Sequence, residues 1–369
     1  MKKQNCLITI LFCLFLGGMA LLSLLLPKRA FSELENRSLA QPPRFSGESL
    51  LSGRFMEEAE TWVSDHAVLR DRWAQLKALA ERVSGKRENE GVYLAARDTL
   101  ISRVDPPDEE LVRRNLAAVR TLAAESGVPV RLGLIPTAAS VWAERLPAGA
   151  PTLDEDAWIG RLYRDWGGPA VDLAGALRAR RQEPVFYRTD HHWTSLGARY
   201  AADAIFSALG QPPLREEELR PVTVSKRFYG TAWSRAGAWW VPPDEIDVMV
   251  PEEGIEVVSL AGGAEQPGAL YVPDWLQKKN QYAYFLGGNQ AACVLRTGAA
   301  GPKLLLLRDS FSDSLAPFLC LRFSEIHLLD LRYYRQSVLD YIRERDIGEV
   351  LVLYSLPTFL EDRNLAHLH

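Results

Sequence analysis

The sequence has little cysteine and no excess of positive charge. Only four of its 369 residues are cysteines, and two of them, Cys6 and Cys13, lie in an apolar segment at the N-terminus. Cys293 and Cys320 remain as the candidates for a disulfide in an exported protein; the sequence leaves their pairing open, and no spacing resembles a zinc site. Lysine and arginine number 43 against 47 acidic residues, a net charge of −4. This balance lacks the basic footprint of a nucleic-acid-binding protein, so no nucleic-acid partner is expected.

The sequence has only one apolar run that is long enough to span a membrane, and it lies at the N-terminus. Residues 6–26 carry no charged side chain, with Lys2 and Lys3 before them and Lys28 and Arg29 after them. A helix of that length rises about 30 Å, enough to cross the hydrocarbon core of a membrane. No clean small-x-small cleavage site lies around residues 23–30. Residues 1–29 are therefore predicted to be an uncleaved signal anchor with the body outside the cytoplasm, and a cleaved, secreted form is the alternative.

The rest of the chain reads as a tether followed by one α/β domain. Residues 30–45 are polar and contain prolines, which is typical of a linker. From residue 46 onward, amphipathic helices and short strands alternate, and the apolar strand at 128–135 is typical of a parallel sheet buried on both faces. Regular alternation ends at about 212 and returns at about 303. The intervening stretch of about 212–301 is predicted to be an irregular, β-rich insertion.

Two segments contain the residues best suited to chemistry. Asp190, His191, His192 and Trp193 lie together in a polar loop, before a helix whose expected N-cap is Thr194. The second segment places Ser310 directly after the apolar strand at 303–307. Ligands of open α/β sheets bind at the carboxyl ends of strands, and the free N–H groups of a following helix turn stabilise an oxyanion there.

Chemistry links these two segments. A serine hydroxyl is a weak nucleophile until an imidazole accepts its proton, and a carboxylate must hold the other ring nitrogen of that imidazole. Asp190 and His192 can form the second half of this arrangement within one loop, and the fold must bring Ser310 to them. A metal site made of Asp190, His191 and His192 is the weaker alternative, because adjacent side chains project differently. No cofactor is expected.

These residues also carry a family resemblance. The chain resembles the DHHW family, which is named for the four residues at 190–193, and is similar more distantly to the alginate O-acetylation proteins, which have an SGNH-hydrolase-like fold. Further matching segments lie at 32–37, 228–231, 285–289, 309–311 and 330–333. The resemblance implies a three-layer α/β sandwich with a permuted motif order, because the serine comes first in ordinary SGNH esterases. It also implies that Asp190, His192 and Ser310 form a catalytic triad.

The activity implied by the resemblance is that of a serine O-acyltransferase or esterase. It would act on a cell-surface or exported polysaccharide, and an acyl donor made inside the cell would require a membrane partner. A non-catalytic glycan-binding or assembly protein that retains the fold is the alternative. Arg308 keeps that alternative open, because it stands where the classical Gly-Asp-Ser block has glycine.

Five further residues are candidates for substrate or oxyanion contacts. Gly288 and Asn289 could contribute to an oxyanion site or form an ordinary turn. Arg308 could contact an anionic substrate or pair with a carboxylate of the protein. Trp193 could fix the histidine by packing or stack on a sugar, and Trp233 could provide a saccharide platform or anchor its glycine-spaced loop.

Overall fold

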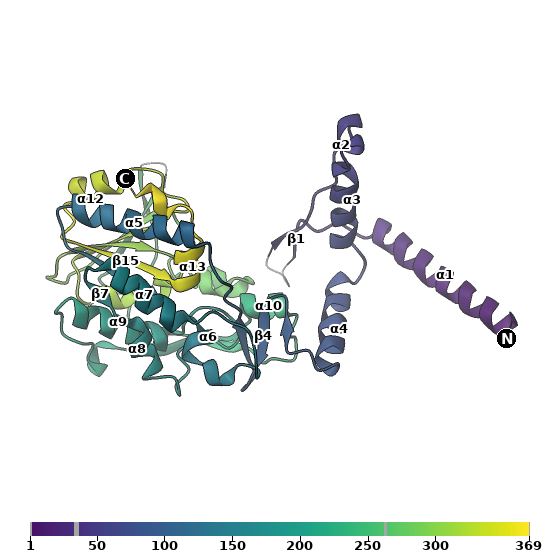
Figure 1. The fold of residues 1–369 in the computed structure, drawn as a ribbon, viewed down its shortest axis with the longest axis horizontal. Coiled ribbons are helices and arrows are strands. Elements are labelled where there is room, and N and C mark those ends of the chain that lie inside the picture. Colours follow the sequence, from purple (N-terminus) through teal and green to yellow (C-terminus); the bar gives the residue numbers. More distant parts are fainter. Residues whose placement is uncertain (1, 33–36, 262–263, 369) are drawn as a thin grey trace.

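A central mixed sheet dominates the structure, a computed structural model that describes residues 2–32, 37–261 and 264–368 (Figure 1). Its strands are β6 (Val130–Ile135), β7 (Ala170–Val171), β10 (Glu256–Ala261), β11 (Ala264–Pro267), β12 (Ala292–Arg296), β13 (Lys303–Arg308), β14 (Glu325–Leu329) and β15 (Glu349–Ser355). Their order is β11-β10-β12-β14-β13-β15-β6-β7. The strands from β14 to β7 run parallel, whereas β12, β10 and β11 join them antiparallel.

Helices cover both faces of this sheet. Along β13, Leu304 and Leu306 enter one apolar cluster while Leu305 and Leu307 enter another, because successive side chains of a strand point to opposite faces. The first cluster includes α6 (Ala138–Val141), α8 (Leu173–Arg178), α9 (Ser195–Ala208) and α11 (Ser312–Leu319). The second includes α5 (Glu109–Glu125), α7 (Glu155–Trp166), α12 (Val338–Glu344) and α13 (Leu356–Glu361). The three-layer α/β sandwich predicted from the sequence is confirmed.

The segment at 212–301 is rich in strands, but it is not a separate lobe. β8 (Val222–Phe228) and β9 (Asp244–Val248) form their own two-stranded sheet, and α10 (Thr231–Ala236) lies between them in sequence. Strands β10, β11 and β12 instead extend the central sheet. Two short 3-10 helices, η3 (Pro273–Gln277) and η4 (Gln281–Tyr284), lie between β11 and β12 in sequence. Cys293 and Cys320 are both buried with free thiols.

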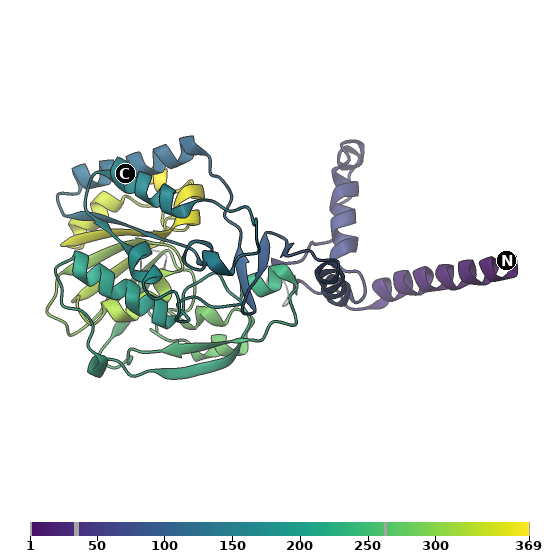
Figure 2. The same ribbon diagram turned by 60° about the horizontal axis from the view of Figure 1, so that its bottom comes forward.

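A small meander and four helices precede the sandwich. The meander consists of β3 (Glu88–Asn89), β4 (Val92–Ala95) and β5 (Thr99–Ser102). Helix α1 (Lys2–Leu25) contains the segment Gln4–Leu25, which is long and apolar enough to cross a membrane by length and composition. Helices α2 (Gly47–Leu51), α3 (Arg54–Asp65) and α4 (Arg70–Val83) lie between α1 and the body (Figures 1 and 2).

The segment after α1 is held against α3. Short strands β1 (Phe31–Ser32) and β2 (Arg37–Ser38) pair with each other, and residues 33–36 of the matching segment at 32–37 lie outside the described residues. Arg37 donates two hydrogen bonds, of 3.0 and 2.6 Å, to the buried Asp65, which also accepts one from the backbone of Ala40. The hydrogen bonds from Arg37 lower the pKa of Asp65 to about 2. The residues expected to be a free linker are thus partly fixed to a helix.

Candidate active site

Ser310 lies at the junction between a buried strand and a helix. β13 ends at Arg308, and α11 begins at Ser312, so the serine sits at the carboxyl end of a parallel strand. Asp309 shapes this junction: one carboxylate oxygen accepts from the N–H of Phe311 at 3.1 Å and the other from the N–H of Ser355 at 2.8 Å. Asp309 therefore shapes the serine turn and ties it to the end of β15, whereas the N-cap of α11, Phe311, has no side-chain capping bond.

Asp190, His192 and Ser310 form a continuous hydrogen-bonded chain. Asp190 Oδ1 lies 2.5 Å from His192 Nδ1, and His192 Nε2 lies 2.8 Å from Ser310 Oγ, across 118 residues of sequence. An ionised carboxylate only accepts hydrogen bonds, so Nδ1 carries the proton and Nε2 is left to accept from the serine. This is the protonation pattern that a general base needs.

The surroundings of Asp190 keep it ionised. It is buried, and its Oδ2 accepts from the N–H and the hydroxyl of Thr231 at 2.7 and 3.0 Å, while Oδ1 also accepts from the N–H of His192. Burial alone would raise the pKa of Asp190. The adjacent imidazoles of His191 and His192, together with these hydrogen bonds, outweigh burial and hold the pKa below its usual value.

Because Gly230 has no side chain, Asp190 can pack directly against its backbone. A β-carbon at residue 230 would lie 2.2 Å from Asp190 Cβ and 2.3 Å from its Oδ2. Gly230→Ala must therefore displace the carboxylate, and a displacement of about 1 Å is expected to lower kcat by about 10²-fold. Gly298→Ala is the matched control, because no atom lies within 4 Å of the added methyl group. Equal rates of ester hydrolysis for the two variants would contradict this prediction.

Hydrogen bonds connect the loop at 190–193 to the start of α11. Trp193 is fully buried, and its Nε1 donates to the carbonyl of Phe311 and to Ser314 Oγ, both at 3.0 Å. Of the two roles considered for Trp193, its burial fits packing and excludes stacking on a sugar in this conformation. Thr194 caps α9 as expected, since its hydroxyl accepts from the N–H of Gly197.

Tyr282 is a site residue that the sequence did not reveal. Its ring stacks on His192, with centroids 3.8 Å apart and an interplanar angle of 11°. Its hydroxyl donates to the carbonyl of Ser310 at 3.1 Å and lies 3.0 Å from Ser314 Oγ. A phenol has one proton, so Ser314 donates to Tyr282 while accepting from Trp193. Tyr282 is one of four tyrosines at 212–301 and lies outside the matching segments, so only the fold identifies it.

Substitutions of Tyr282 separate its hydroxyl from its ring. Tyr282→Phe keeps the stack on His192 and is expected to lower kcat/KM by up to about tenfold, because it removes one hydrogen bond to the serine turn. Tyr282→Ala also frees the imidazole, so we expect a larger loss and a changed pH–rate profile. An unchanged profile in Tyr282→Ala, with activity lost only in proportion to folded protein, would show that Tyr282 supports the fold alone.

Comparisons with known proteins identify the fold. Residues 94–237 match the family model described as SGNH hydrolase-like domain, acetyltransferase AlgX. A DHHW family protein from Eubacterium siraeum superposes with a TM-score of 0.64 and 22% identity, over 76% of this chain and 95% of that one. This chain has the SGNH hydrolase-like fold. The predicted resemblance to DHHW proteins is confirmed at the level of structure.

Two further relatives share parts of the chain. Bacillus cereus PatB1, in a structure with a sulfonyl adduct, has a TM-score of 0.62 and 16% identity, over 75% of this chain and 98% of that one. A probable alginate O-acetylase, AlgJ of Pseudomonas putida, is 27% identical over 177 residues, which are 45% of this chain and 46% of that protein. The chain therefore spans about half the length of the curated relatives it matches.

His191 lies closer to His192 and its hydrogen-bonded partners than expected. Its ring centroid is 3.8 Å from that of His192, and possible ligand atoms of Asp190, His191 and His192 all lie within 4.8 Å of one another. The expectation that adjacent rings would project apart was wrong. Both nitrogens of His192 are nevertheless engaged by Asp190 and Ser310, and His191 Nδ1 lies 2.8 Å from the hydroxyl of Thr231. These contacts favour a hydrogen-bonded triad over a metal site.

A cleft of about 490 Å³ opens beside the triad. Asp190, His191, Thr231 and Phe311 are among the residues that line this cleft. Residues 100–105, 137–139 and several residues at 355–361 also line it, whereas Ser310 and His192 are not among its lining residues. The cleft provides room for an acyl group and part of an acceptor at the carboxyl end of the sheet, where α/β proteins bind ligands.

None of the five further candidates is among the described residues that line this cleft. Arg308 is buried and forms an ion pair with Asp313, so it takes the structural role considered for it. Trp233 lies on α10 and packs against the apolar cluster that includes Val92 of β4, with the ammonium of Lys279 4.5 Å from its ring centroid. Gly288 adopts a positive φ of 91° in a turn, and Asn289 Oδ1 lies 3.5 Å from Arg332.

Glu155 is a buried acid behind the cleft wall. It accepts hydrogen bonds from the N–H and hydroxyl of Thr137, which lines the cleft, and burial raises its pKa to about 7 against those hydrogen bonds. The unfolded chain ionises near the ordinary value of 4.5. Between pH 4.5 and about 7, unfolding therefore releases a proton from Glu155. The free energy of unfolding is expected to fall by roughly 3 kcal/mol as pH rises through this range.

Denaturant titrations at pH 4.5 to 8 test this expectation. Glu155→Gln should remove that part of the pH dependence, whereas the surface variant Glu144→Gln should retain it. If the free energy of unfolding changed with pH in the same way in Glu155→Gln and in the unsubstituted protein, Glu155 would not be the group responsible.

Proposed function

We propose that this protein is a membrane-anchored, extracytoplasmic serine O-acyltransferase or esterase that acts on a cell-surface or exported polysaccharide. The observation that carries the proposal is the hydrogen-bonded chain from Asp190 through His192 to Ser310. The SGNH-like fold and the relatives named as alginate O-acetylases support the reaction class and the polysaccharide substrate. The apolar segment Gln4–Leu25 supports anchoring.

In the proposed mechanism, each residue of the triad has one role. Ser310 Oγ attacks the acyl carbonyl carbon while its proton passes to His192 Nε2, and Asp190 stabilises the imidazolium that forms. The leaving alcohol takes that proton, which gives an acyl-enzyme on Ser310. A carbohydrate hydroxyl, or water, then gives its proton to His192 and attacks the ester. The proton returns to Ser310 as the serine leaves, so the enzyme is regenerated.

Arg308 does not disturb this machinery. Its guanidinium turns into the interior to Asp313, so replacement of the usual glycine leaves the serine turn accessible. Arg308 is the residue that kept a non-catalytic glycan-binding protein open as an alternative. Its buried ion pair with Asp313 gives it a structural role instead.

A chromogenic acetyl ester tests the proposal with the full chain in detergent micelles. Hydrolysis should be lost in Ser310→Ala and retained in Ser312→Ala, the matched control, because Ser312 Oγ is buried without a hydrogen-bond partner in the described part of the chain. Adding a soluble oligosaccharide and measuring O-acetyl groups on it separates transfer from hydrolysis. Equal activity in the two variants would contradict the proposal.

A further inference from the structure

Helix α4 has one face on the body and an apolar face away from it. Ala78 is buried and lies so close to Gly237 that a side chain there would touch it, and the Arg82 guanidinium lies 4.6 Å from the Trp240 ring centroid. At 3.6 residues per turn, the opposite face carries a stripe of apolar side chains. These are Leu69, Trp73, Leu76 and Val83, exposed to 61, 44, 54 and 81%.

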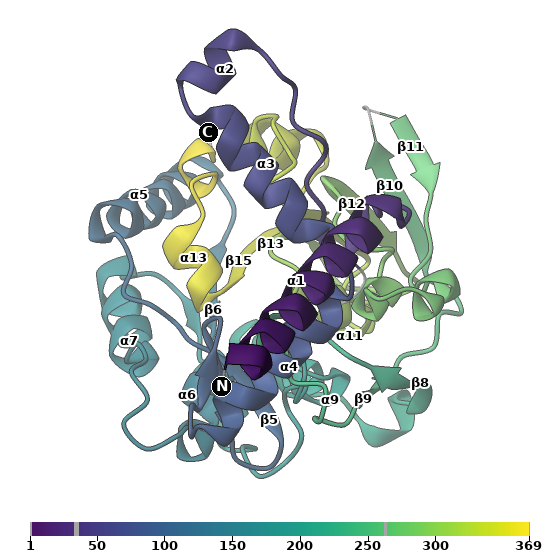
Figure 3. The same cartoon turned by 90° about the vertical axis from the view of Figure 1, so that its right-hand side faces the viewer.

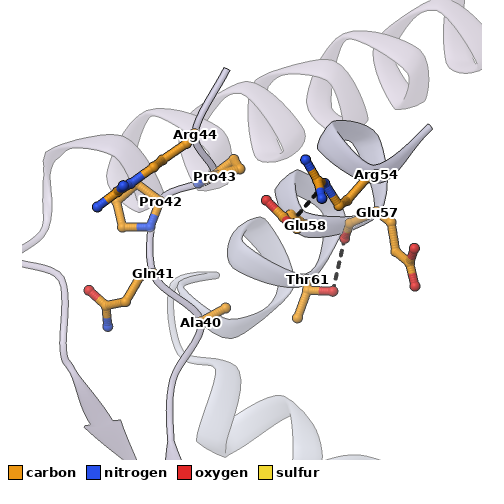
Figure 4. A pocket seen from close by; sticks show the side chains of 9 residues that line it. All are labelled: Ala40, Gln41, Pro42, Pro43, Arg44, Arg54, Glu57, Glu58 and Thr61. Atoms are coloured by element: carbon orange, nitrogen blue, oxygen red, sulfur yellow. Dashed lines mark hydrogen bonds and ion pairs between the residues drawn. The ribbon is translucent and has the colours of Figure 1, made fainter. Parts of the chain in front are cut away.

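Helix α3 repeats this pattern. Its residues Arg54, Glu57, Glu58 and Thr61 line a groove against residues 40–44, as Figure 4 shows. The opposite face presents a second apolar stripe, which includes the exposed side chains of Met56 and Val63. An amphipathic helix normally turns its apolar face inward, so both helices require something other than the body to cover them.

The corner between α3 and α4 is attached to the C-terminal end of α1. The N–H of Val68 donates to Ser23 Oγ at 2.9 Å, His66 Nε2 lies 3.0 Å from the carbonyl of Arg29, and Arg29 forms a 3.0 Å ion pair with Asp71. Both helices run across the axis of α1 (Figure 2). In Figure 3, α1 projects toward the viewer, and α3 and α4 lie between it and the body.

We propose that α3 and α4 lie flat in the membrane interface, with their apolar stripes against the lipid bilayer. The inference rests on the proposed anchoring by α1, because a spanning α1 would bring its C-terminal end, and the corner attached to it, to the bilayer surface. On α4, the cationic side chains of Arg72 and Lys77 flank the stripe, where their heads can reach lipid phosphates. The two helices would hold the cleft at a fixed height above the membrane, within reach of an acyl donor carried by a membrane protein.

Site-specific fluorescent labels on the full chain in liposomes test this placement. Cys6 and Cys13 are replaced by alanine, while the buried Cys293 and Cys320 remain. An environment-sensitive label is attached at Leu76→Cys or Val83→Cys. The matched control is Arg120→Cys, which is exposed on α5, far from α1 (Figure 1). Nitroxide-bearing lipids and aqueous iodide serve as the two quenchers.

The interface placement predicts blue-shifted emission at residues 76 and 83 that lipid nitroxides quench, while the label at residue 120 is quenched only by iodide. Quenching of residues 76 and 83 by iodide alone would overturn it. Blue-shifted emission insensitive to lipid nitroxides would also overturn it and show that protein, such as a second copy, covers the stripe.

A further variant that keeps Cys13 as the labelled residue reports on the anchor itself. Lipid quenching at Cys13 without quenching at residues 76 and 83 would refute the interface placement alone. Absence of lipid quenching at Cys13 would refute the anchoring, and with it this inference.

Discussion

His192→Ala is expected to lower kcat/KM for an acetyl ester by about 10³- to 10⁴-fold, because Ser310 would lose the base that accepts its proton. The change removes an interaction made in the transition state, so the loss should fall on kcat rather than KM. Asp190→Asn should cost a comparable factor, since an amide no longer fixes the proton on Nδ1. Stopped-flow or steady-state kinetics with a chromogenic ester measure both variants.

The three triad substitutions should not be additive. Once Ser310 is alanine, removal of His192 has no further proton transfer to disturb, so the double variant should match Ser310→Ala. Far-UV circular dichroism and thermal unfolding serve as controls for folding. Losses that multiply in the double variant would show that the two residues act independently and would contradict a shared mechanism.

Asp313→Ala is expected to destabilise the protein by about 3–5 kcal/mol, because it leaves the buried guanidinium of Arg308 without its ion-pair partner. Both residues are almost completely buried. Burial alone would lower the pKa of Arg308, but Asp313 and other nearby acids raise it, so the arginine stays charged in the folded protein. Denaturant unfolding measures the change in the free energy of unfolding.

A double-mutant cycle isolates this pair. Replacement of both residues in Arg308→Met with Asp313→Leu removes both charges at similar volume, so much of the stability lost in Asp313→Ala should return. A double variant that is as unstable as the sum of its single variants would show that the two side chains contribute separately.

The sandwich and the Asp190–His192 half of the site are predicted from local signals, whereas the resemblance to DHHW proteins adds Ser310 to them. The leucines of β13 require burial on both faces, and Asp190 and His192, two residues apart, already form half of the site within one loop. Contacts between distant segments have no such signal. The stack of Tyr282 on His192, the hydrogen bonds of Arg37 to Asp65, and the addition of β10 to the central sheet all depend on register and packing that only the fold defines.

The most direct test of the central claim, that His192 activates Ser310, is covalent labelling by a sulfonyl fluoride followed by peptide mass spectrometry. Sulfonyl fluorides react with a serine whose proton is removed by a base. The account predicts one adduct, on the peptide containing Ser310, that forms rapidly in the unsubstituted protein and in Ser312→Ala but not in His192→Ala. Labelling of Ser310 at the same rate in His192→Ala, or no labelling of Ser310 in any form of the folded protein, would contradict it.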